Sequence, residues 1–214
     1  MGKTAIILGA TGLTGSLILD KLLVNEAYGK IKLFSRKASG REHPKLEEYL
    51  GDLLRLDQFE EEFSGDEVYC CIGTTRKKTP DLAGYRTIDF GIPASAAGLA
   101  KTNKIPVFAV VSALGANPKS SIFYNRIKGE MENAVLTAGI ERTYILRPSI
   151  ISGNRIERRR GEKISLALFK CLRPLLIGRM KRFRSIEAEM IANCMIRLTN
   201  SDQPSQILES DEIC

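Results

Sequence analysis

The stretch TAIILGATGLTG, residues 4–15, decides the fold of this chain. Its first five residues form an apolar run, and Gly9, Gly12 and Gly15 follow at three-residue spacing. Apolar side chains then recur at helical spacing, which predicts a strand, a tight turn and a helix in succession. Glycines let the backbone approach a phosphate there, where free N–H groups and the helix dipole attract an anion. Glycines also occur where a chain simply turns, but the flanking strand and helix favour a phosphate-binding turn.

Length and composition predict one domain. The chain has 214 residues, of which 43% are hydrophobic, enough to bury the core of one doubly wound sheet. It contains no apolar run of the roughly 18 to 20 residues that span a bilayer, and we expect no signal peptide before the first strand. Five cysteines lack metal-ligand spacing, which suits a reducing compartment, so we expect a cytoplasmic protein. Because His43 is the only histidine, a histidine-based triad or a multi-histidine metal site is not expected.

Alternation and apolar runs predict the rest of the α/β sheet. After the first strand, we expect strands within residues 31–34, 46–50, 67–72 and 105–111, a sixth strand ending before Arg147, and a short last strand at 207–208. The first predicted helix ends near residue 26, and the second starts near residue 56. The third spans 85–103, the fourth includes 124–128, and the fifth spans 186–198. Asp57 and Glu60 resemble a capping box, which leaves Asp52 free for another task such as adenine contact.

Basic residues follow the second predicted strand. An NAD-specific fold places an acidic residue there, on the ribose 2′-hydroxyl. Here Arg36 and Lys37 occupy the position, and a guanidinium can bind a 2′-phosphate through two hydrogen bonds. The sequence therefore favours NADP over NAD, although a solvated basic loop has the same composition. The loop at residues 76–78 presents the same alternatives, a phosphate contact or ordinary surface charge.

A candidate catalytic group follows the central strand. Ser112 ends that strand, and Tyr124 and Lys128 are spaced to lie one turn apart on one helix face. A neighbouring ammonium favours the phenolate, which brings a tyrosine closer to acid or base work at neutral pH. Tyr-x-x-x-Lys pairs are common on solvated helices, but the serine and the upstream glycine turn favour a catalytic role.

Together these motifs resemble the short-chain dehydrogenase/reductase superfamily, in its atypical and extended NAD(P)-binding branches. The matching segments are residues 9–15, 51–52, 71–75, 112, 124 with 128, and 147–149. The Cys-x-Gly-Thr-Thr-Arg type of segment and the Arg-Pro pair look closest to the Tat-interacting oxidoreductase-like group. The resemblance implies a three-layer Rossmann fold with a mostly parallel sheet of order 3-2-1-4-5-6, NADPH over the carboxyl ends of the strands, and a small C-terminal cap facing the substrate.

The resemblance also implies residue roles. Tyr124 would donate a proton to a carbonyl, Lys128 would hold the nicotinamide ribose and lower the tyrosine pKa, and Ser112 would orient the carbonyl. Many members carry an asparagine where this chain has Asp89, whose charge would compete with the tyrosine for the ammonium. The implied cofactor-binding residues are Gly9, Thr11, Gly12, Leu13, Thr14, Gly15, Arg36, Asp52, Leu53, Gly73, Thr74, Thr75, Lys128, Arg147 and Pro148.

Residues 154–184 change the charge of the chain. They contain eleven Lys or Arg and two Glu, so this stretch has a net charge of +9. The whole chain has a net charge of +7, so the remaining residues sum to −2. We expect residues 152–185 to form a basic cap within the single domain 1–214. The cap could contact an acidic substrate, an anionic surface or a partner protein, or could be a packed helix with a solvated rim. Charge alone leaves nucleic acid open, but the stretch has no interleaved aromatics or recognised binding motif.

The main hypothesis is an NADP(H)-dependent oxidoreductase that reduces a small carbonyl or related substrate, as a monomer or homodimer without a metal. One alternative is a regulatory protein that binds NADP(H) and signals through a partner surface without useful turnover. A nucleotide-sugar epimerase is a third hypothesis, but 214 residues leave only a small substrate domain.

Overall fold

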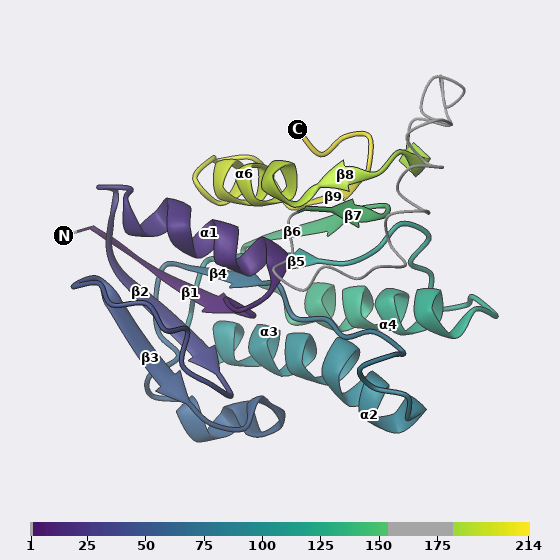
Figure 1. The fold of residues 1–214 in the computed structure, drawn as a ribbon, viewed down its shortest axis with the longest axis horizontal. Helices are drawn as coiled ribbons and strands as arrows, with labels where there is room; N and C mark the ends of the chain where they lie inside the picture. Colours follow the sequence, from purple (N-terminus) through teal and green to yellow (C-terminus); the bar gives the residue numbers. More distant parts are fainter. Residues whose placement is uncertain (1, 154–181) are drawn as a thin grey trace.

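The computed structural model describes residues 2–153 and 182–214 and is built on a seven-stranded sheet (Figure 1). The strand order is β3-β2-β1-β4-β5-β6-β9, and every neighbouring pair is parallel. The predicted order 3-2-1-4-5-6 is confirmed, and the short last strand extends it beyond β6. The strands are β1 (Lys3–Leu8), β2 (Tyr28–Ser35), β3 (Leu46–Leu50), β4 (Glu67–Cys70), β5 (Val107–Val111), β6 (Arg142–Arg147) and β9 (Gln206–Glu209).

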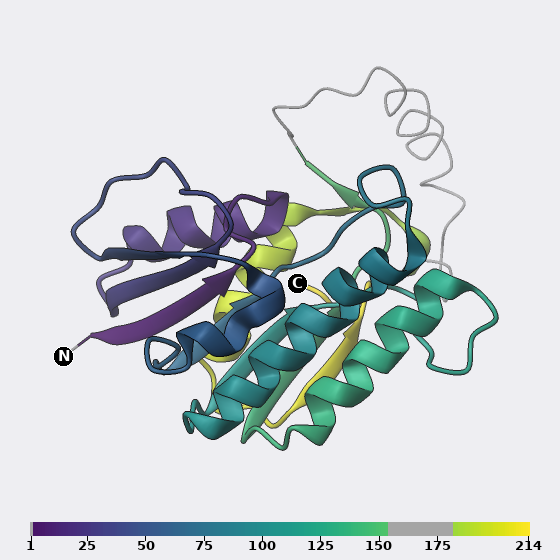
Figure 2. The same ribbon diagram turned by 90° about the horizontal axis from the view of Figure 1, so that it is seen from below.

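Helices cover both faces of the sheet, so the predicted three-layer Rossmann fold is confirmed (Figures 1 and 2). Helices α1 (Leu13–Leu23) and α6 (Ala188–Thr199) lie together on one face. Helices α3 (Ile92–Thr102) and α4 (Phe123–Thr137) lie on the other, with the 3₁₀ turns η1 (Leu53–Phe59) beside α3. This arrangement leaves the carboxyl ends of the strands open between the layers, where α/β sheets of this kind bind ligands.

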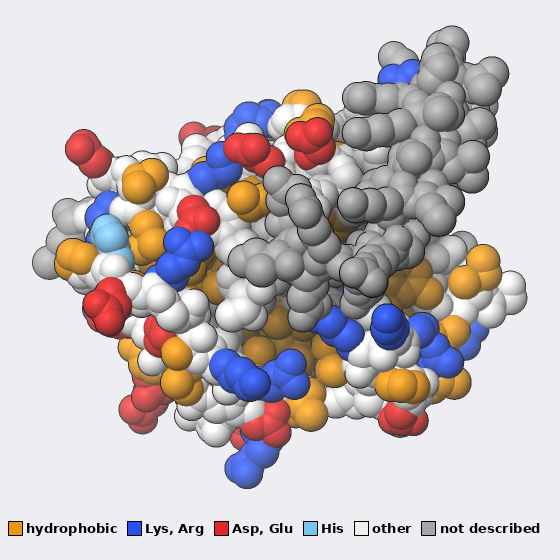
Figure 3. Space-filling view, viewed as in Figure 1, with side chains coloured by type: hydrophobic (Ala, Val, Ile, Leu, Met, Phe, Trp, Pro, Cys, Tyr) orange, Lys and Arg blue, Asp and Glu red, His pale blue; other side chains and the backbone are white. Residues whose placement is uncertain are grey.

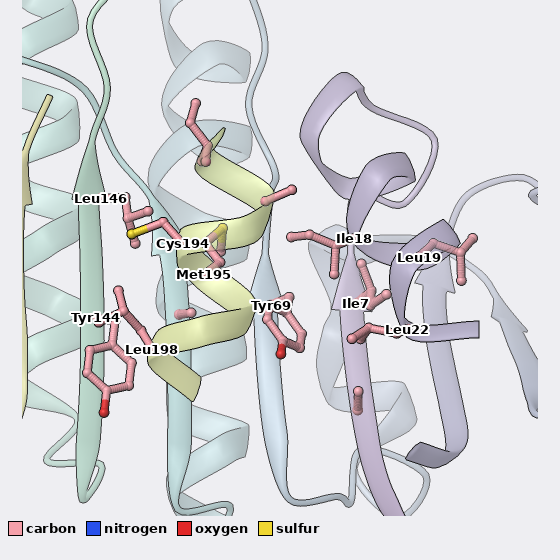
Figure 4. Close-up of a cluster of buried hydrophobic side chains, with 14 of the residues drawn as sticks. Ile7, Ile18, Leu19, Leu22, Tyr69, Tyr144, Leu146, Cys194, Met195 and Leu198 are labelled. Carbon is pink, nitrogen blue, oxygen red and sulfur yellow. The ribbon is translucent and has the colours of Figure 1, made fainter. Parts of the chain in front are cut away.

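Apolar side chains fill the space between each helical layer and the sheet. On the first face, Ile18 and Leu22 of α1 and Met195 of α6 pack beside Tyr69 and Tyr144 of the sheet (Figure 4). Ala96, Ala97 and Ala100 of α3 have no exposed surface, so this helix approaches the second face closely, as its many small residues predict. Burial on both faces explains the continuous apolar sequence of β1 and β5.

The helix predicted over residues 85–103 is divided. Helix α2 (Leu82–Arg86) passes into a π-helical turn, η2 (Thr87–Gly91), and then into α3, where Pro93 occupies the first turn. A π-helical turn inserts an extra residue into the helix and is often found at functional sites. Here it contains the buried Asp89.

A second, small sheet flanks the predicted cap. Strand β7 (Ile151–Ser152) pairs in parallel with β8 (Ile186–Glu187), which precedes α6. These two strands lie on either side of residues 154–181 in the sequence. The predictions for residues 154–181, the main part of the basic cap, lie outside the described residues.

Candidate cofactor and active site

The glycine turn between β1 and α1 has no room for side chains. Gly9 has a φ of +86°, and a Cβ there would lie 2.8 Å from the carbonyl oxygen of Cys71. A Cβ at Gly15 would lie 2.2 Å from the carbonyl oxygen of Gly9, so only glycine lets α1 start this close to the turn. The Gly12 N–H donates to the Gly9 carbonyl at 2.9 Å, which closes the turn. These contacts match the geometry that a pyrophosphate-binding turn requires.

A groove of about 360 Å³ runs from this turn along the carboxyl ends of β1 to β4. Its lining combines the glycine turn with the ends of the neighbouring strands and with η2. The lining residues are Gly9, Thr11, Gly12, Arg36, Asp52, Leu53, Leu54, Cys71, Ile72, Gly73, Thr74, Lys78, Thr79, Ile88 and Ile92. The combination of a side-chain-free turn, apolar walls and cationic groups fits a dinucleotide.

Two cationic side chains line this groove, Arg36 from the end of β2 and Lys78 from the loop after β4. Neither side chain has a hydrogen-bond or ion-pair partner among residues 2–153 and 182–214. Asp52 lies in the same groove, but it also caps η1, because its Oδ1 accepts from the Leu54 N–H at 3.0 Å. The predicted capping box at Asp57 and Glu60 is therefore wrong, since the helical turns begin earlier.

The structure brings eight of the expected cofactor-binding residues to the groove: Gly9, Thr11, Gly12, Arg36, Asp52, Leu53, Gly73 and Thr74. Leu13, Thr14, Gly15, Thr75, Lys128, Arg147 and Pro148 are not among its lining residues. Thr14 and Gly15 are buried in the first turn of α1, where they support the groove from behind.

A second, largely apolar cavity of about 520 Å³ lies at the carboxyl ends of β5 and β6. Its described lining is Ser112, Ala113, Leu114, Tyr124, Pro148, Ser149, Ile150, Ile151 and Phe183, none of which is charged. Figure 3, drawn from the same side as Figure 1, shows a hollow near the middle of the molecule, with hydrophobic side chains in it and Lys or Arg at its margin; the picture does not assign it to either cavity. Two of the three predicted catalytic side chains, Ser112 and Tyr124, thus share one cavity.

Lys128 lies one helical turn from Tyr124 and forms a buried ion pair. Its Nζ lies 3.1 Å from Oδ1 of Asp89, and the two side chains are 4% and 1% exposed. Burial alone would lower the pKa of Lys128, but the charges of Asp89 and Tyr124 outweigh it and raise that pKa. Lys128 is therefore a fixed positive charge beside the phenol.

Three neighbouring influences act on the pKa of Tyr124. Burial raises the pKa of Tyr124, the ammonium of Lys128 opposes the rise, and the charge of Asp89 adds to it. The net direction is upward, so Tyr124 is held as a neutral phenol at neutral pH. Lys128 does lower the pKa of Tyr124, as the resemblance implies, but burial and the charge of Asp89 outweigh the lysine, so the net shift is upward.

Asp89 also connects this cluster to the groove. Its Oδ2 accepts a hydrogen bond from the Thr74 N–H at 2.8 Å, on the loop after β4 that lines the groove. Both carboxylate oxygens therefore have partners. One buried side chain of the π-helical turn thus contacts both the groove loop and the lysine next to Tyr124.

The structure adds a second buried carboxylate, Glu132 of α4, which the sequence did not single out. The Ser112 hydroxyl donates to its Oε1, and Arg147 binds both of its oxygens, with Nε–Oε1 at 2.9 Å and Nη2–Oε2 at 2.6 Å. Arg147 Nη1 also binds Glu209 of β9 at 2.8 Å. Arg147 thus binds two carboxylates, and its expected contact with the cofactor stays a prediction. Only its spacing, one turn beyond Lys128, indicates that Glu132 belongs to the site.

Comparison with known proteins identifies the family. The NAD(P)H-binding family matches residues 9–160, which is most of the chain. The chain belongs to this NAD(P)H-binding family. The family is described as NAD(P)H-binding, which agrees with the dinucleotide-shaped groove. The match does not distinguish NADP from NAD.

Relatives of this NAD(P)H-binding protein confirm the resemblance stated from the motifs. Protein HTATIP2 of Rattus norvegicus is 32% identical over 174 residues, 79% of this chain and 72% of the relative. Protein fmp52, mitochondrial, of Aspergillus fumigatus is 34% identical over 169 residues, 76% of this chain and 72% of the relative. The similarity to HTATIP2 confirms the Tat-interacting group within the atypical short-chain dehydrogenase/reductases.

Solved structures confirm the fold. The enzyme WbmH of Bordetella bronchiseptica, in complex with NAD+, superposes with a TM-score of 0.73 at 17% identity, covering 98% of this chain and 76% of that one. ADP-L-glycero-D-manno-heptose-6-epimerase of Helicobacter pylori gives 0.72 at 15% identity, covering 96% and 76%. Within residues 2–153 and 182–214, no helix is long and apolar enough to cross a membrane. No cluster of potential metal ligands occurs in the same part of the chain.

Proposed function

We propose that this protein is an NADP(H)-dependent oxidoreductase that reduces a small carbonyl or related compound. The observation that carries the proposal is the position of Tyr124. Its side chain lines the apolar cavity, and the adjacent Lys128 is bound through Asp89 to Thr74 of the groove. A fixed cation, one helical turn from the proton donor, is therefore connected by direct contacts to the loop of a dinucleotide-shaped groove.

The chemistry divides between cofactor and protein. When bound, NADP(H) supplies the hydride, and this chain supplies the proton and the electrostatics. Tyr124, held as a neutral phenol, donates its hydroxyl proton to the substrate oxygen. The ammonium of Lys128 stabilises the phenolate that remains, and Asp89 keeps that ammonium charged and in place.

The preference for NADP over NAD rests on Arg36 and Lys78. Both line the groove, both lack partners within the described residues, and no acidic side chain ends β2, where a carboxylate would bind a ribose hydroxyl. A 2′-phosphate would be neutralised by these two cations. The structure of WbmH contains NAD+, so the preference is a property proposed for this chain only.

A second candidate is a cofactor-sensing protein with little turnover. The observation that favours it is the raised pKa of Tyr124, because a tightly held proton is a poorer donor. An epimerase acting on nucleotide sugars is less favoured. The structural relatives cover 96% or more of this chain with only 76% of their own, and the described cavity lining has no charged group for a diphosphate.

The proposal is tested by a carbonyl screen. Wild-type protein and the Tyr124→Phe variant are saturated with NADPH, and NADPH absorbance is followed with small apolar aldehydes and ketones. We expect consumption by the wild type only, with equal NADPH binding by both proteins. Binding without consumption by any substrate would favour the sensing protein, and equal consumption by the two proteins would refute the role of Tyr124.

Location and assembly remain predictions. The proposal of a cytoplasmic protein rests on Cys70, Cys71, Cys194 and Cys214, which are all free thiols. Several fungal relatives carry mitochondrial in their names, so cell fractionation is the deciding measurement. A monomer or homodimer is proposed, and light scattering of the protein alone tests the oligomeric state. Residues 154–184 are proposed as a surface for a protein or an anionic partner, and light scattering with acidic lipid vesicles tests the anionic partner.

A further inference from the structure

The hydroxyl of Ser112 is committed to a carboxylate behind the cavity. Ser112 is 4% exposed at the end of β5 and donates its proton to Oε1 of Glu132. Glu132 is 3% exposed, and Arg147 binds both of its oxygens. A carboxylate whose two oxygens both accept from a guanidinium acts as a hydrogen-bond acceptor. Ser112 must therefore be the donor of the bond to Glu132.

A serine hydroxyl has one proton and two lone pairs. Because Glu132 takes the proton, Ser112 can offer only lone pairs to a ligand in the cavity that it lines. A carbonyl oxygen has no proton to give to those lone pairs. The hydroxyl of an alcohol has one, so an alcohol can donate to Ser112 where a ketone cannot.

Tyr124 on the same cavity complements this arrangement. As a neutral phenol it donates a hydrogen bond, and the oxygen of either a ketone or an alcohol can accept it. An alcohol therefore satisfies both residues at once, whereas a ketone satisfies only Tyr124. The rest of the described lining consists of apolar side chains and Ser149, whose hydroxyl donates to the backbone carbonyl of Arg184.

We propose that Glu132 is a positioning residue that makes Ser112 a hydrogen-bond acceptor, and that the cavity consequently recognises an apolar alcohol in preference to the matching ketone. The inference deepens the proposed function and rests on it. Of the alcohol and the ketone that the reaction interconverts, the alcohol is the more tightly bound. The ion pair of Glu132 with Arg147 then contributes to ligand recognition as well as to stability.

The test uses 1-phenylethanol and acetophenone, which have the same apolar frame. Binding of the alcohol is measured with protein saturated with NADPH, and binding of the ketone with protein saturated with NADP+, so that neither mixture can react. Saturation-transfer NMR titrations compare wild type with Ser112→Ala. Because each ligand is compared with itself in the same cofactor state, the difference between the two cofactor forms cancels.

We expect Ser112→Ala to weaken 1-phenylethanol by about 3- to 10-fold, the range of one neutral hydrogen bond, and acetophenone by less than about 2-fold. The control Ser152→Ala, outside the cavity lining, leaves both unchanged. The double variant Glu132→Leu with Arg147→Met removes the ion pair without leaving a lone buried charge. It frees the serine proton, so acetophenone binding should improve relative to the alcohol.

A loss of acetophenone binding in Ser112→Ala as large as the loss of alcohol binding would overturn the inference. So would equal binding by wild type and Ser112→Ala, or no binding of either ligand to the cofactor-loaded protein. The proposed function fails differently, through a lack of NADPH binding by the wild type. A protein that binds NADPH but prefers the ketone refutes only the inference.

Discussion

The two ends of the central sheet each hold a cluster of tyrosine, lysine and carboxylate, but only the cluster at the carboxyl end lines a cavity described above. At the amino end, Tyr28 and Tyr69 both donate to Oε1 of Glu67, at 2.5 and 2.6 Å. Lys3 pairs with the other oxygen of Glu67 at 3.3 Å, and Thr199 of α6 closes the cluster on Tyr69 at 2.6 Å. Every polar group in it is used by another part of the chain.

At the carboxyl end the same three kinds of group are arranged differently. Asp89 binds Lys128 and a backbone N–H, while Tyr124 is left facing the cavity and is 41% exposed. Burial raises the pKa of the tyrosines in both clusters, so the direction of the shift does not distinguish them. Access to a ligand does. A shifted pKa thus indicates function only when the group also faces a cavity.

The largest difference is expected from removing one phenolic hydroxyl at each end. Tyr124→Phe should lower kcat by about 10²- to 10⁴-fold, the usual contribution of a general acid, with little change in stability. Tyr28→Phe should leave kcat within about 2-fold but lower the free energy of unfolding by roughly 1 to 3 kcal/mol, since Glu67 loses a donor. Steady-state kinetics and urea denaturation measure the two effects. Loss of activity in Tyr28→Phe would break the comparison.

Replacing the lysine should also cost more stability in the carboxyl-end cluster than in the amino-end cluster. Lys128→Met leaves Asp89 charged and buried, so we expect a destabilisation of roughly 3 to 5 kcal/mol. Lys3→Met removes a lysine that is 40% exposed, and the change should stay within about 1 kcal/mol. Adding Asp89→Leu to Lys128→Met should recover most of the lost stability. No recovery would show that the lysine stabilises the fold through other contacts.

Sequence patterns predicted the sheet order and most elements, because local apolar runs and glycine turns determine them. The strand at residues 46–50 is predicted to the residue, and the last strand is placed beside β6 only by the structure. The π-helical turn was missed, since residues 87–91 have no local signal that distinguishes π from α hydrogen bonding.

The candidate site was predicted less completely than the fold. Glycines and the Tyr-x-x-x-Lys pair carry their own spacing, so they can be found without a structure. The ion pairs of Arg147 with Glu132 and Glu209 join β6 to α4 and β9. The two partners lie 15 and 62 residues from Arg147 in the sequence, so no local pattern predicts these contacts. The helix cap was assigned to Asp57 instead of Asp52, because two nearby acidic residues both fit a helix cap.

A smaller effect is expected from neutralising Asp89, the carboxylate of the cluster at the carboxyl end of the sheet. Asp89→Asn removes a charge that raises the pKa of Tyr124, so that pKa should fall. The alkaline inflection of the pH profile of alcohol oxidation, which requires the phenolate, should therefore move to lower pH. Glu67→Gln is the control and should lower stability without moving the inflection. An inflection that moves to higher pH would contradict the role of Asp89.

The smallest effect concerns alkaline stability. The pKa of Tyr28 is raised above the ordinary value of 10.0, so the folded protein keeps a proton that the unfolded chain loses. Stability from this group is complete below about pH 10 and is lost as pH rises towards the folded-state pKa. Tyr28→Phe should therefore lose less stability than wild type between about pH 8 and about pH 11, as measured by urea denaturation at both values. A steeper loss in the variant would contradict the linkage.

The most direct test of the central claim is the binding of NADPH and NADH to wild type and Arg36→Glu, measured by calorimetry. The account predicts that the wild type binds NADPH more tightly, by roughly 10-fold or more for a charge-assisted contact. Arg36→Glu should remove this preference and leave NADH binding nearly unchanged. Equal binding of the two cofactors by wild type, or no binding of either, would contradict the account.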